Sequence, residues 1–294
     1  MSRIPNLRSA AAATFVAVVG AMGMAPAEAA VVISYPGFTG ACSGGGLTCV
    51  GNTAVTGGGA LRLTPATTSQ SGAGYSTTAI TLGTGATFST TFQFLITNRG
   101  GIAPADGLTF VVAAATAGLG TGGGGLGYSG VLNSVAVEFD TYDNGEVGGS
   151  NHVGVDSNGV LANNGVNPYG VSNCSSITGF VLGCMSNGDI WTATIDYDGS
   201  TNLLNVFVQD GASAVQHIIS GMSINIGSLL GTNTAFVGFT SGTGSGFANH
   251  DILNWQLAND RSLGTPPGVP EPGSLALVGA GLLGAAWARR RRNA

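Results

Sequence analysis

Ten short apolar or alternating segments, separated by glycine-rich turns, recur along the chain between Val31 and Leu257. In a strand successive side chains point to opposite faces, so each segment can pack one face on a core. The 51 glycines and the scarcity of long helix-forming windows also favour strands joined by tight turns. The expected strands are residues 31–35, 60–63, 86–96, 108–114, 135–141, 152–155, 190–196, 203–208, 235–240 and 252–257. Ten or more strands in one run predict an all-β sandwich.

The first thirty residues have the order of a secretory signal peptide. Arg3 and Arg8 precede an apolar run at 10–24, and small residues follow at 27–30. This order predicts cleavage after Ala29 or Ala30. We therefore expect residues 1–30 to be a signal peptide and residues 31–262 to form the folded domain.

The last segment, 263–294, contains a second targeting signal. Val-Pro-Glu-Pro-Gly at 269–273 leads into an apolar run at 274–288 and four arginines at 289–292. The run is shorter than the ~20 residues that a membrane-spanning helix needs. The tail resembles the PEP-CTERM sorting signal of exopolysaccharide-producing Gram-negative bacteria, which a membrane protease of the exosortase type removes. That resemblance implies a transient inner-membrane anchor and then a place at the cell surface, in the outer membrane or in the extracellular matrix. A permanent C-terminal transmembrane anchor is the alternative.

The charge of the domain restricts its partners. The chain has no lysine, and six of its nine arginines lie in the terminal segments. Between Val31 and Gly268 twelve acidic residues face three arginines, a formal net charge of −9. That balance argues against sequence-independent binding of nucleic acid and favours cations and neutral ligands. The membrane is expected as a partner only through the two terminal segments.

Export makes the four cysteines interpretable as disulfides. Cys42 and Cys49 form one sequence-local pair, and Cys174 and Cys184 form another. Two small closed loops are the simplest of the three connectivities in an oxidising compartment.

Acidic residues are concentrated in one stretch, 135–156. Five of the fourteen carboxylates in the chain lie there, together with one of its three histidines. At strand spacing Val135, Val137 and Phe139 share one face, while Glu138 and Asp140 share the other. Like charges this close raise each other's pKa unless a cation or a shared proton intervenes. The stretch therefore predicts a cation site on a strand whose other face is buried.

Several segments, in this order, resemble an L-type (legume-type) lectin. They are ADGLTFVV at 105–112, TGGGGLG at 121–127, NSVAVEFDTYDN at 133–144, NHVGVD at 151–156, WTATIDYDGSTNLLNVFV at 191–208 and AFVGFTSGTGSGFANHDILNWQL at 235–257. The resemblance covers nearly the whole secreted part. It implies a concanavalin-like jelly-roll β-sandwich of two antiparallel sheets that binds carbohydrate without catalysis.

The resemblance also implies a metal site. Glu138 and Asp140 would be ligands, Tyr142 would offer its backbone carbonyl, Asn144 its side-chain amide and His152 a ring nitrogen. Oxygen ligands suit Ca²⁺, and a neutral imidazole suits Mn²⁺ or another transition metal.

One ligand of the family pattern is missing. The loop between Asn144 and His152 contains no Asp to bridge the two metals. Glu146 or Asp143 could take its place, and otherwise calcium alone remains. We therefore expect calcium and leave the transition metal open.

The carbohydrate-binding residues that the resemblance implies are Asp106, Gly124, Tyr142, Asn144, Ser245 and Gly246. Asp106 would accept hydrogen bonds from sugar hydroxyls, after a cis Ala105–Asp106 peptide. Gly124 would donate its backbone N–H, which gives a role to a run of four glycines that alone suggests a flexible linker. Ser245 and Gly246 lie in the loop that would select the sugar.

Two other functions compete with a lectin that acts at the cell surface or in the exopolysaccharide matrix. A laminarinase-type glycosidase of the same fold carries Glu-x-Asp-x-x-Glu, whereas Glu138, Asp140 and Asp143 end this motif in a shorter Asp. A structural surface or matrix protein would keep the sandwich without its sugar site. The resemblance also allows a homo-oligomer that pairs through edge strands.

Overall fold

A computed structural model describes residues 31–82, 85, 87–116, 118–176 and 179–259 of the 294-residue chain. The expected signal peptide and the expected sorting tail lie outside the described residues. Within the described part, no helix is both long and apolar enough to cross a membrane.

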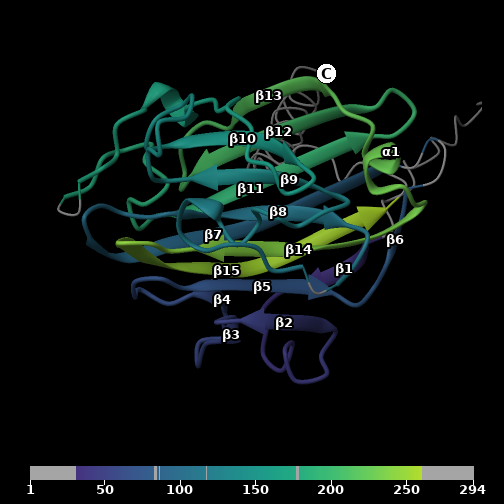
Figure 1. The fold of residues 1–294 in the computed structure, drawn as a ribbon, viewed down its shortest axis with the longest axis horizontal. Coiled ribbons are helices and arrows are strands. Elements are labelled where there is room, and N and C mark those ends of the chain that lie inside the picture. The colour runs from purple at the N-terminus through teal and green to yellow at the C-terminus, as the bar shows by residue number, and fades with distance from the viewer. Residues whose placement is uncertain (1–30, 83–84, 86, 117, 177–178, 260–294) are drawn as a thin grey trace, which may run out of the picture.

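Strands dominate the described residues, in which the helix is confined to three short turns (Figure 1). The helical turns are η1 (Gly123–Gly125), η2 (Pro168–Gly170) and α1 (Ile226–Leu230). The strands are β1 (Val31–Tyr35), β2 (Leu47–Gly51), β3 (Ala54–Val55), β4 (Leu61–Thr64), β5 (Ser71–Ser76), β6 (Ile80–Thr81), β7 (Thr87–Gly101), β8 (Gly107–Ala113), β9 (Ser134–Asp140), β10 (His152–Ser157), β11 (Ile190–Asp198), β12 (Leu203–Asp210), β13 (Gln216–Ser223), β14 (Thr234–Gly242) and β15 (Gly246–Asn259).

These strands form two antiparallel sheets that pack face to face. One sheet has the order β13-β12-β11-β7-β15-β4-β3, with β1 paired to β15. The other has the order β10-β9-β8-β14-β5-β2, with β6 paired to β14. The chain passes repeatedly from one sheet to the other, so the expected all-β sandwich of two antiparallel sheets is confirmed.

Aromatic residues from both sheets fill the space between the sheets. The fully buried Phe92 of β7 lies 4.9 Å from Phe239 of β14 and 5.7 Å from Phe139 of β9, measured between ring centroids. Trp255 of β15 contacts the same group edge-on, 4.9 Å from Phe239. Burial of such large rings is the main force that holds two sheets together.

A second, smaller apolar cluster covers the outer face of the seven-stranded sheet. Tyr75, Val111, Tyr128 and Ala136 belong to it, and all are buried. This cluster lies under the glycine-rich loop before β9. The outer face of β9 is therefore covered rather than exposed, and any charged group on it is buried.

Each of the ten expected strands overlaps an observed one, and five observed strands were not expected. The missed strands are β2, β3, β5, β6 and β13. In β5, a Cβ on Gly72 would collide with the Leu63 carbonyl of β4, so β5 needs small residues where it packs closely on β4. Small residues do not give the alternation of apolar and polar side chains by which a strand is recognised in a sequence. Both expected disulfides are present, Cys42–Cys49 and Cys174–Cys184.

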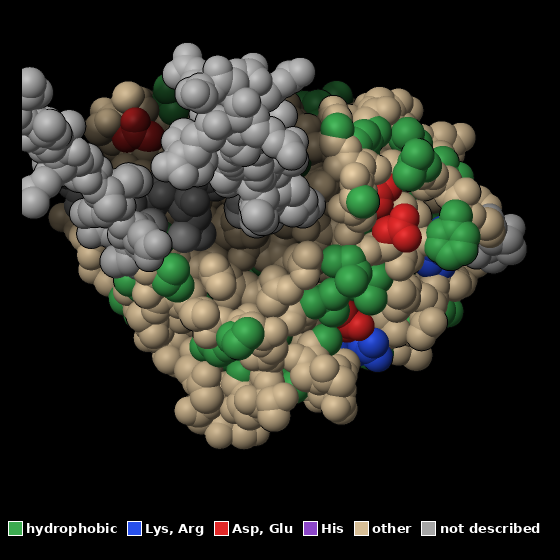
Figure 2. Space-filling model, turned by 180° about the vertical axis from the view of Figure 1, so that it is seen from behind, with side chains coloured by type: hydrophobic (Ala, Val, Ile, Leu, Met, Phe, Trp, Pro, Cys, Tyr) green, Lys and Arg blue, Asp and Glu red, His purple; other side chains and the backbone are tan. Residues whose placement is uncertain are grey.

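The surface carries little charge. Figure 2 shows one face on which most side chains are neutral and polar, with scattered acidic, basic and apolar groups. Charged residues make up only 8% of the chain, which agrees with this view. A place where several of these few charged residues come together is therefore a candidate functional site.

Candidate functional site

Two neighbouring strands place the acidic residues on one face. In the antiparallel pair β9–β10, His152 lies opposite Asp140 and Gly154 lies opposite Glu138. Residues opposite each other point to the same side, so the two carboxylates and the imidazole share a face. A Cβ on Gly154 would overlap the Glu138 carboxylate, so only glycine lets Glu138 lie across β10.

Glu138, Asp140 and His152 form a compact buried cluster. Each offers one potential ligand atom, and the three atoms lie within 4.8 Å of one another. The side chains are at most 3% exposed. Such a donor set fits a cation that accepts both carboxylate oxygen and imidazole nitrogen.

The hydrogen bonds of His152 leave one ring nitrogen without a partner. Its Nδ1 lies 2.9 Å from the Gly149 carbonyl, so Nδ1 carries the proton and donates it. Nε2 then presents a lone pair to Glu138 Oε1 at 3.3 Å. Neither atom has a hydrogen-bond partner among the described residues. Two acceptors at this distance require a proton or a metal ion between them.

Burial shifts the titration of the carboxylates around this cluster. It raises the pKa of Asp140 well above its ordinary value, and the charges of Glu138, Glu146 and Asp106 add to the effect. It also raises the pKa of Asp106 to about 7 and that of Asp156 to about 8. Burial opposes protonation of His152, but the nearby Glu138 carboxylate and the Gly149 carbonyl favour the protonated ring and outweigh burial, so the pKa of His152 is raised as well. Without a cation the site therefore favours bound protons.

The loop after β9 brings further expected residues to the same place. Tyr142 N–H donates to Asp140 Oδ1 at 2.7 Å and starts a tight turn. Asn144 and Glu146 line a cavity of about 300 Å³ together with Glu138, Asp140 and Gly124. Asp143 instead accepts a hydrogen bond from Gly145 N–H and lines a different cavity. Of the two residues considered as replacements for the missing aspartate, Glu146 is the one that lies at the cluster.

Asp106 lies next to this loop. The Ala105–Asp106 peptide is cis, as expected. The Asp106 carbonyl accepts hydrogen bonds from Thr141 N–H at 2.8 Å and Thr141 Oγ1 at 3.0 Å, which tie it to the end of β9. The side chain is 4% exposed, and its Oδ2 has no protein partner among the described residues. A buried carboxylate oxygen without a donor is suited to accept hydrogen bonds from a ligand.

The glycine-rich loop is ordered by its backbone. Gly123 N–H donates to the Thr243 carbonyl at 3.1 Å, and Leu126 and Tyr128 anchor the loop in the protein. Gly124, in η1, lies so close to Asn144 that a Cβ would overlap the Asn144 side chain. The loop is therefore no flexible linker, and its glycines permit the contact between two expected ligand-binding residues.

The turn between β14 and β15 differs in detail from the expectation. Ser245 is exposed, as a sugar-selecting residue would be. Gly246 is buried and packs against Ala103 and Ala105, where a Cβ would collide with both. Gly244 faces the Asp106 carboxylate, and its backbone hydrogen bond opposes the pKa shift of Asp106. Nothing in the sequence pattern singled out Gly244.

Asp156 is a second residue that the sequence analysis did not place in the site. It is 1% exposed, and its Oδ1 accepts a hydrogen bond from Ala162 N–H at 2.6 Å. Its Oδ2 has no partner among the described residues, and burial, followed by the charge of Glu138, raises its pKa. The signal was the alternation of His152, Gly154 and Asp156, which puts all three on one face of β10.

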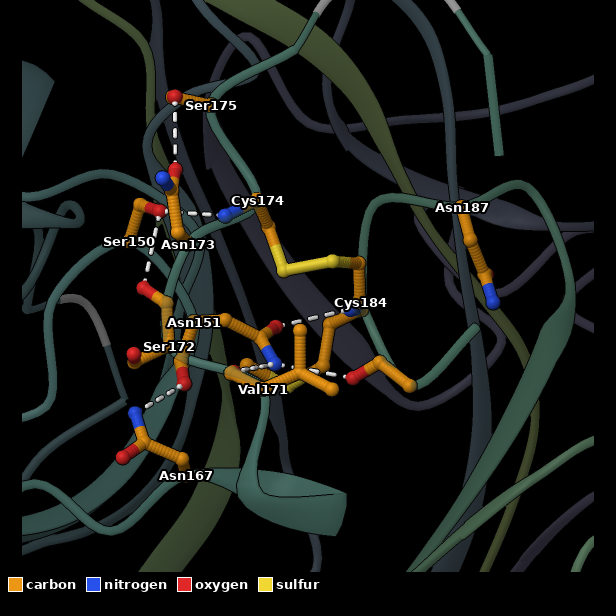
Figure 3. Close-up of a disulfide and its surroundings, with 12 residues drawn as sticks. Ser150, Asn151, Asn167, Val171, Ser172, Asn173, Cys174, Ser175, Cys184 and Asn187 are labelled. Carbon is orange, nitrogen blue, oxygen red and sulfur yellow. Dashed lines mark hydrogen bonds between the residues drawn. A yellow bond between two sulfur atoms is a disulfide. The ribbon is translucent and has the colours of Figure 1, made fainter. Parts of the chain in front are cut away.

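A network of amides and hydroxyls supports the loop between Asn144 and His152 (Figure 3). The buried Asn151 donates from Nδ2 to the carbonyls of Val171 and Gly183, both at 2.9 Å, and accepts from Met185 N–H at 2.9 Å. Ser150 Oγ accepts from Cys174 N–H at 2.7 Å. The segment that the Cys174–Cys184 disulfide closes therefore holds the loop between Asn144 and His152.

Comparison with protein families gives two matches. Residues 31–267 match the model of the legume lectin domain, and residues 268–292 match that of the PEP-CTERM protein-sorting motif. The second motif indicates export through sorting.

Individual relatives agree with the first match. The chain is 33% identical over 190 residues to the L-type lectin-domain containing receptor kinase VIII.1 of Arabidopsis thaliana, over 62% of this chain and 25% of the kinase. It is 31% identical over 165 residues to the basic agglutinin of Psophocarpus tetragonolobus, over 53% of this chain and 61% of the agglutinin. The chain thus spans between a quarter and about three fifths of these relatives.

Solved structures share the fold. The lectin from Bauhinia forficata in complex with GalNAc superimposes with a TM-score of 0.61 at 23% identity, over 78% of this chain and 98% of that one. The basic winged bean lectin with Tn-antigen gives a TM-score of 0.59 at 26% identity, over 73% and 92%.

Proposed function

The chain belongs to the legume lectin domain family, and from this premise we propose that its folded domain binds carbohydrate in a calcium-dependent manner. The observation that carries the proposal is the convergence, at one end of the sandwich, of the acidic cluster, the unpartnered Oδ2 of Asp106 and the Gly124–Asn144 contact. Two of the similar lectins were solved with bound GalNAc and with Tn-antigen, which supports the same proposal.

In this proposal Asp140, the Tyr142 carbonyl and Asn144 hold calcium. Glu138, Asp140 and His152 hold a transition metal such as Mn²⁺, and Glu146 supplies the carboxylate that the usual aspartate does not. The lone pair of His152 Nε2 and the unpaired Glu138 Oε1 support this assignment. The ions would fix the loops and keep the buried carboxylates ionised, with no bond-breaking step.

The sugar would lie over the calcium loop. Asp106 would accept hydrogen bonds from two hydroxyls, and the Gly124 N–H and the Asn144 amide would donate to it. The Tyr142 ring would pack on its apolar face, and Ser245 would contact its variable side. Gly246, being buried, would act by letting Ala103 and Ala105 pack closely.

Glu138 and Asp143 are not arranged as the pair of carboxylates that a glycosidase needs. Retaining hydrolysis needs two carboxyl groups about 5 Å apart around one bond. Glu138 and Asp143 line separate cavities, and Asp143 is engaged in a turn. We therefore propose a binding protein rather than an enzyme.

Export sets the place of action. With the PEP-CTERM motif at 268–292, we propose that residues 1–30 are removed as a signal peptide and that residues 31–262 form the lectin domain. An exosortase-type protease would process the 263–294 tail, which would place the domain at the cell surface or in the extracellular matrix. A glycan or exopolysaccharide there would be its ligand.

Asp106→Asn tests the sugar site. The amide keeps the shape of the side chain but removes the charge and one acceptor, so affinity should fall by about ten- to a hundredfold. A glycan array first identifies the glycan that the wild type binds most tightly. Titration calorimetry then measures binding of that glycan, and thermal unfolding checks the fold. Asp198→Asn is the control, because Asp198 is a partly exposed residue that ends β11 opposite Thr87, at the other end of the sandwich. Unchanged binding by Asp106→Asn would refute the assignment.

A further inference from the structure

Asn144 is followed by a glycine, and an asparagine in this sequence can modify itself. The backbone nitrogen of the next residue attacks the side-chain carbon Cγ, and a glycine has no side chain to shield that nitrogen. The chain has four Asn-Gly pairs, which begin at Asn144, Asn158, Asn164 and Asn187. The four asparagines differ in how firmly the surrounding protein holds them.

Hydrogen bonds restrain the side chains of Asn164 and Asn187. Asn187 is 1% exposed, and its Nδ2 donates to Asp210 Oδ2 at 3.0 Å. Asn164 is bound to the backbone of Val155 on both sides, because its Nδ2 donates to the carbonyl at 2.7 Å and its Oδ1 accepts from the N–H at 3.0 Å. Neither side chain can turn toward its own backbone while these bonds persist.

The pair Asn158–Gly159 is restrained at both reacting groups. Asn158 Oδ1 accepts a hydrogen bond from Asn133 N–H at 3.1 Å. Gly159 is buried, and its N–H donates to the Tyr128 hydroxyl at 3.3 Å. This pair, like the two at Asn164 and Asn187, must therefore open locally before the nitrogen can reach the side chain.

The Asn144 side chain lacks such restraint. Asn144 and Gly145 are both exposed, and both line the cavity of about 300 Å³. The Asn144 amide takes part in none of the hydrogen bonds found among the described residues and lies against Gly124. Gly145 N–H donates to the Asp143 carboxylate at 2.8 Å, but at exposed positions, where water can replace the carboxylate. Asn144 is thus the most accessible of the four.

The turn after Asn144 requires its glycine. Gly145 has a φ of +97°, which residues with a side chain rarely adopt. A larger residue that would shield the nitrogen can therefore replace Gly145 only with backbone strain. The reactive pair is part of the turn that carries Asn144 to the proposed calcium position.

We propose that Asn144 is a self-modification site, at which the metal-free protein deamidates to aspartate or isoaspartate while the other three Asn-Gly pairs remain intact. The Gly145 nitrogen loses its proton and bonds to Cγ of Asn144, the bond from Cγ to Nδ2 breaks, and ammonia leaves. Water then opens the five-membered ring at either carbonyl. One asparagine and one water give one acid and one ammonia, so no oxidant, reductant or further reactant is needed.

The effect of this modification on ligand binding rests on the proposed function. While Asn144 holds calcium through its amide oxygen, its side chain cannot turn toward its own backbone, so calcium protects the residue. Once the amide is lost, the N–H donor that Asn144 would offer to the sugar is gone. Isoaspartate also adds a carbon atom to the backbone of the loop. A protein left without calcium therefore loses its sugar site irreversibly.

Peptide mass spectrometry of the full-length protein tests the site. The protein is incubated in mildly alkaline buffer with EDTA, with calcium, or with urea after reduction of its disulfides. In EDTA we expect Asn144 to deamidate at least about tenfold faster than each of the other three pairs, because these must open first. Saturating calcium should slow the reaction at Asn144 by about tenfold or more. In urea the four rates should lie within about threefold of one another.

The other three Asn-Gly pairs are matched controls within the same molecule. Equal rates at all four pairs in EDTA, or the same preference for Asn144 in urea as in EDTA, would overturn the self-modification site and leave the proposed function standing. Calcium titration of fresh protein separates the two claims. Absence of calcium binding would overturn the proposed function, whereas selective deamidation in EDTA would still support the site. If calcium binds but leaves the rate at Asn144 unchanged, the protection is wrong.

The deamidated protein tests the effect on the sugar. Ion exchange separates it from the intact protein, because deamidation adds one negative charge. We expect it to bind the glycan that the intact protein binds most tightly at least about tenfold more weakly, in calcium. Equal affinity of the two fractions would overturn this effect.

Discussion

At the scale of single residues, glycines decide how closely the loops of the site approach each other. Gly124→Ala adds one methyl group that would overlap the Asn144 side chain. Asn144 must then move from the proposed calcium position, and we expect calcium affinity to fall by at least about tenfold. Calcium titration of the EDTA-stripped protein measures this.

Gly57→Ala is the control for that experiment, because a Cβ at Gly57 meets no atom within 4 Å. Neither glycine has a positive φ, so backbone strain does not differ between the two variants. Wild-type calcium affinity in Gly124→Ala would contradict the role of the Gly124–Asn144 contact.

Some residues of the site could be predicted from the sequence and others could not. Glu138, Asp140 and His152 could be placed because they follow strand alternation on adjacent strands. Gly244 could not, since its nearness to Asp106 depends on how the β14–β15 turn folds over a cis peptide. Asp156 had the right alternation, but its burial comes from the loop around Ala162, which leaves no pattern in the sequence.

At the scale of elements, the loop between β9 and β10 depends on the disulfide-closed segment. Asn151→Asp replaces the two N–H donors to Val171 and Gly183 by an acceptor. Two buried carbonyls then lose their partners beside a buried charge, which should cost about 3 kcal/mol. Urea unfolding measures the loss, and calcium affinity should fall with it because the loop is released.

Asn233→Asp, at an exposed position, should leave both quantities nearly unchanged. If Asn151→Asp proved as stable as the wild type, the supporting role of the segment would be wrong. This dependence was invisible in the sequence, because the partners of Asn151 lie 20 to 34 residues away. Strands with an apolar face, such as β7 and β9, were predictable, whereas β5 and the exposed edge strand β13 lacked that pattern.

At the scale of the whole molecule, the buried carboxylates make stability depend on pH and on metal. The pKa values of Asp106 and Asp156 are raised to about 7 and 8, so in the metal-free protein each favours the folded state only while protonated. Their contribution is fully present below the unfolded pKa near 4 and is lost as the pH rises through the folded pKa. The raised pKa of His152 acts in the same direction.

His250 acts in the opposite direction, but only at lower pH. Burial lowers its pKa to about 3, so it costs stability only as the pH falls below the ordinary histidine value near 6.5. Between pH 6.5 and 8.5 the melting temperature in EDTA should therefore fall, by on the order of 5 °C. In saturating calcium the fall should vanish, because a cation favours the ionised carboxylates. A metal-free melting temperature that rises over this range would contradict the assignment.

The central claim is that calcium and sugar share one site, and a glycan array read in calcium and in EDTA tests it most directly. We expect binding of a defined set of neutral glycans in calcium, its loss in EDTA and its return when excess calcium is added back. Equal binding in calcium and in EDTA, or no binding by a folded protein in calcium, would contradict the claim.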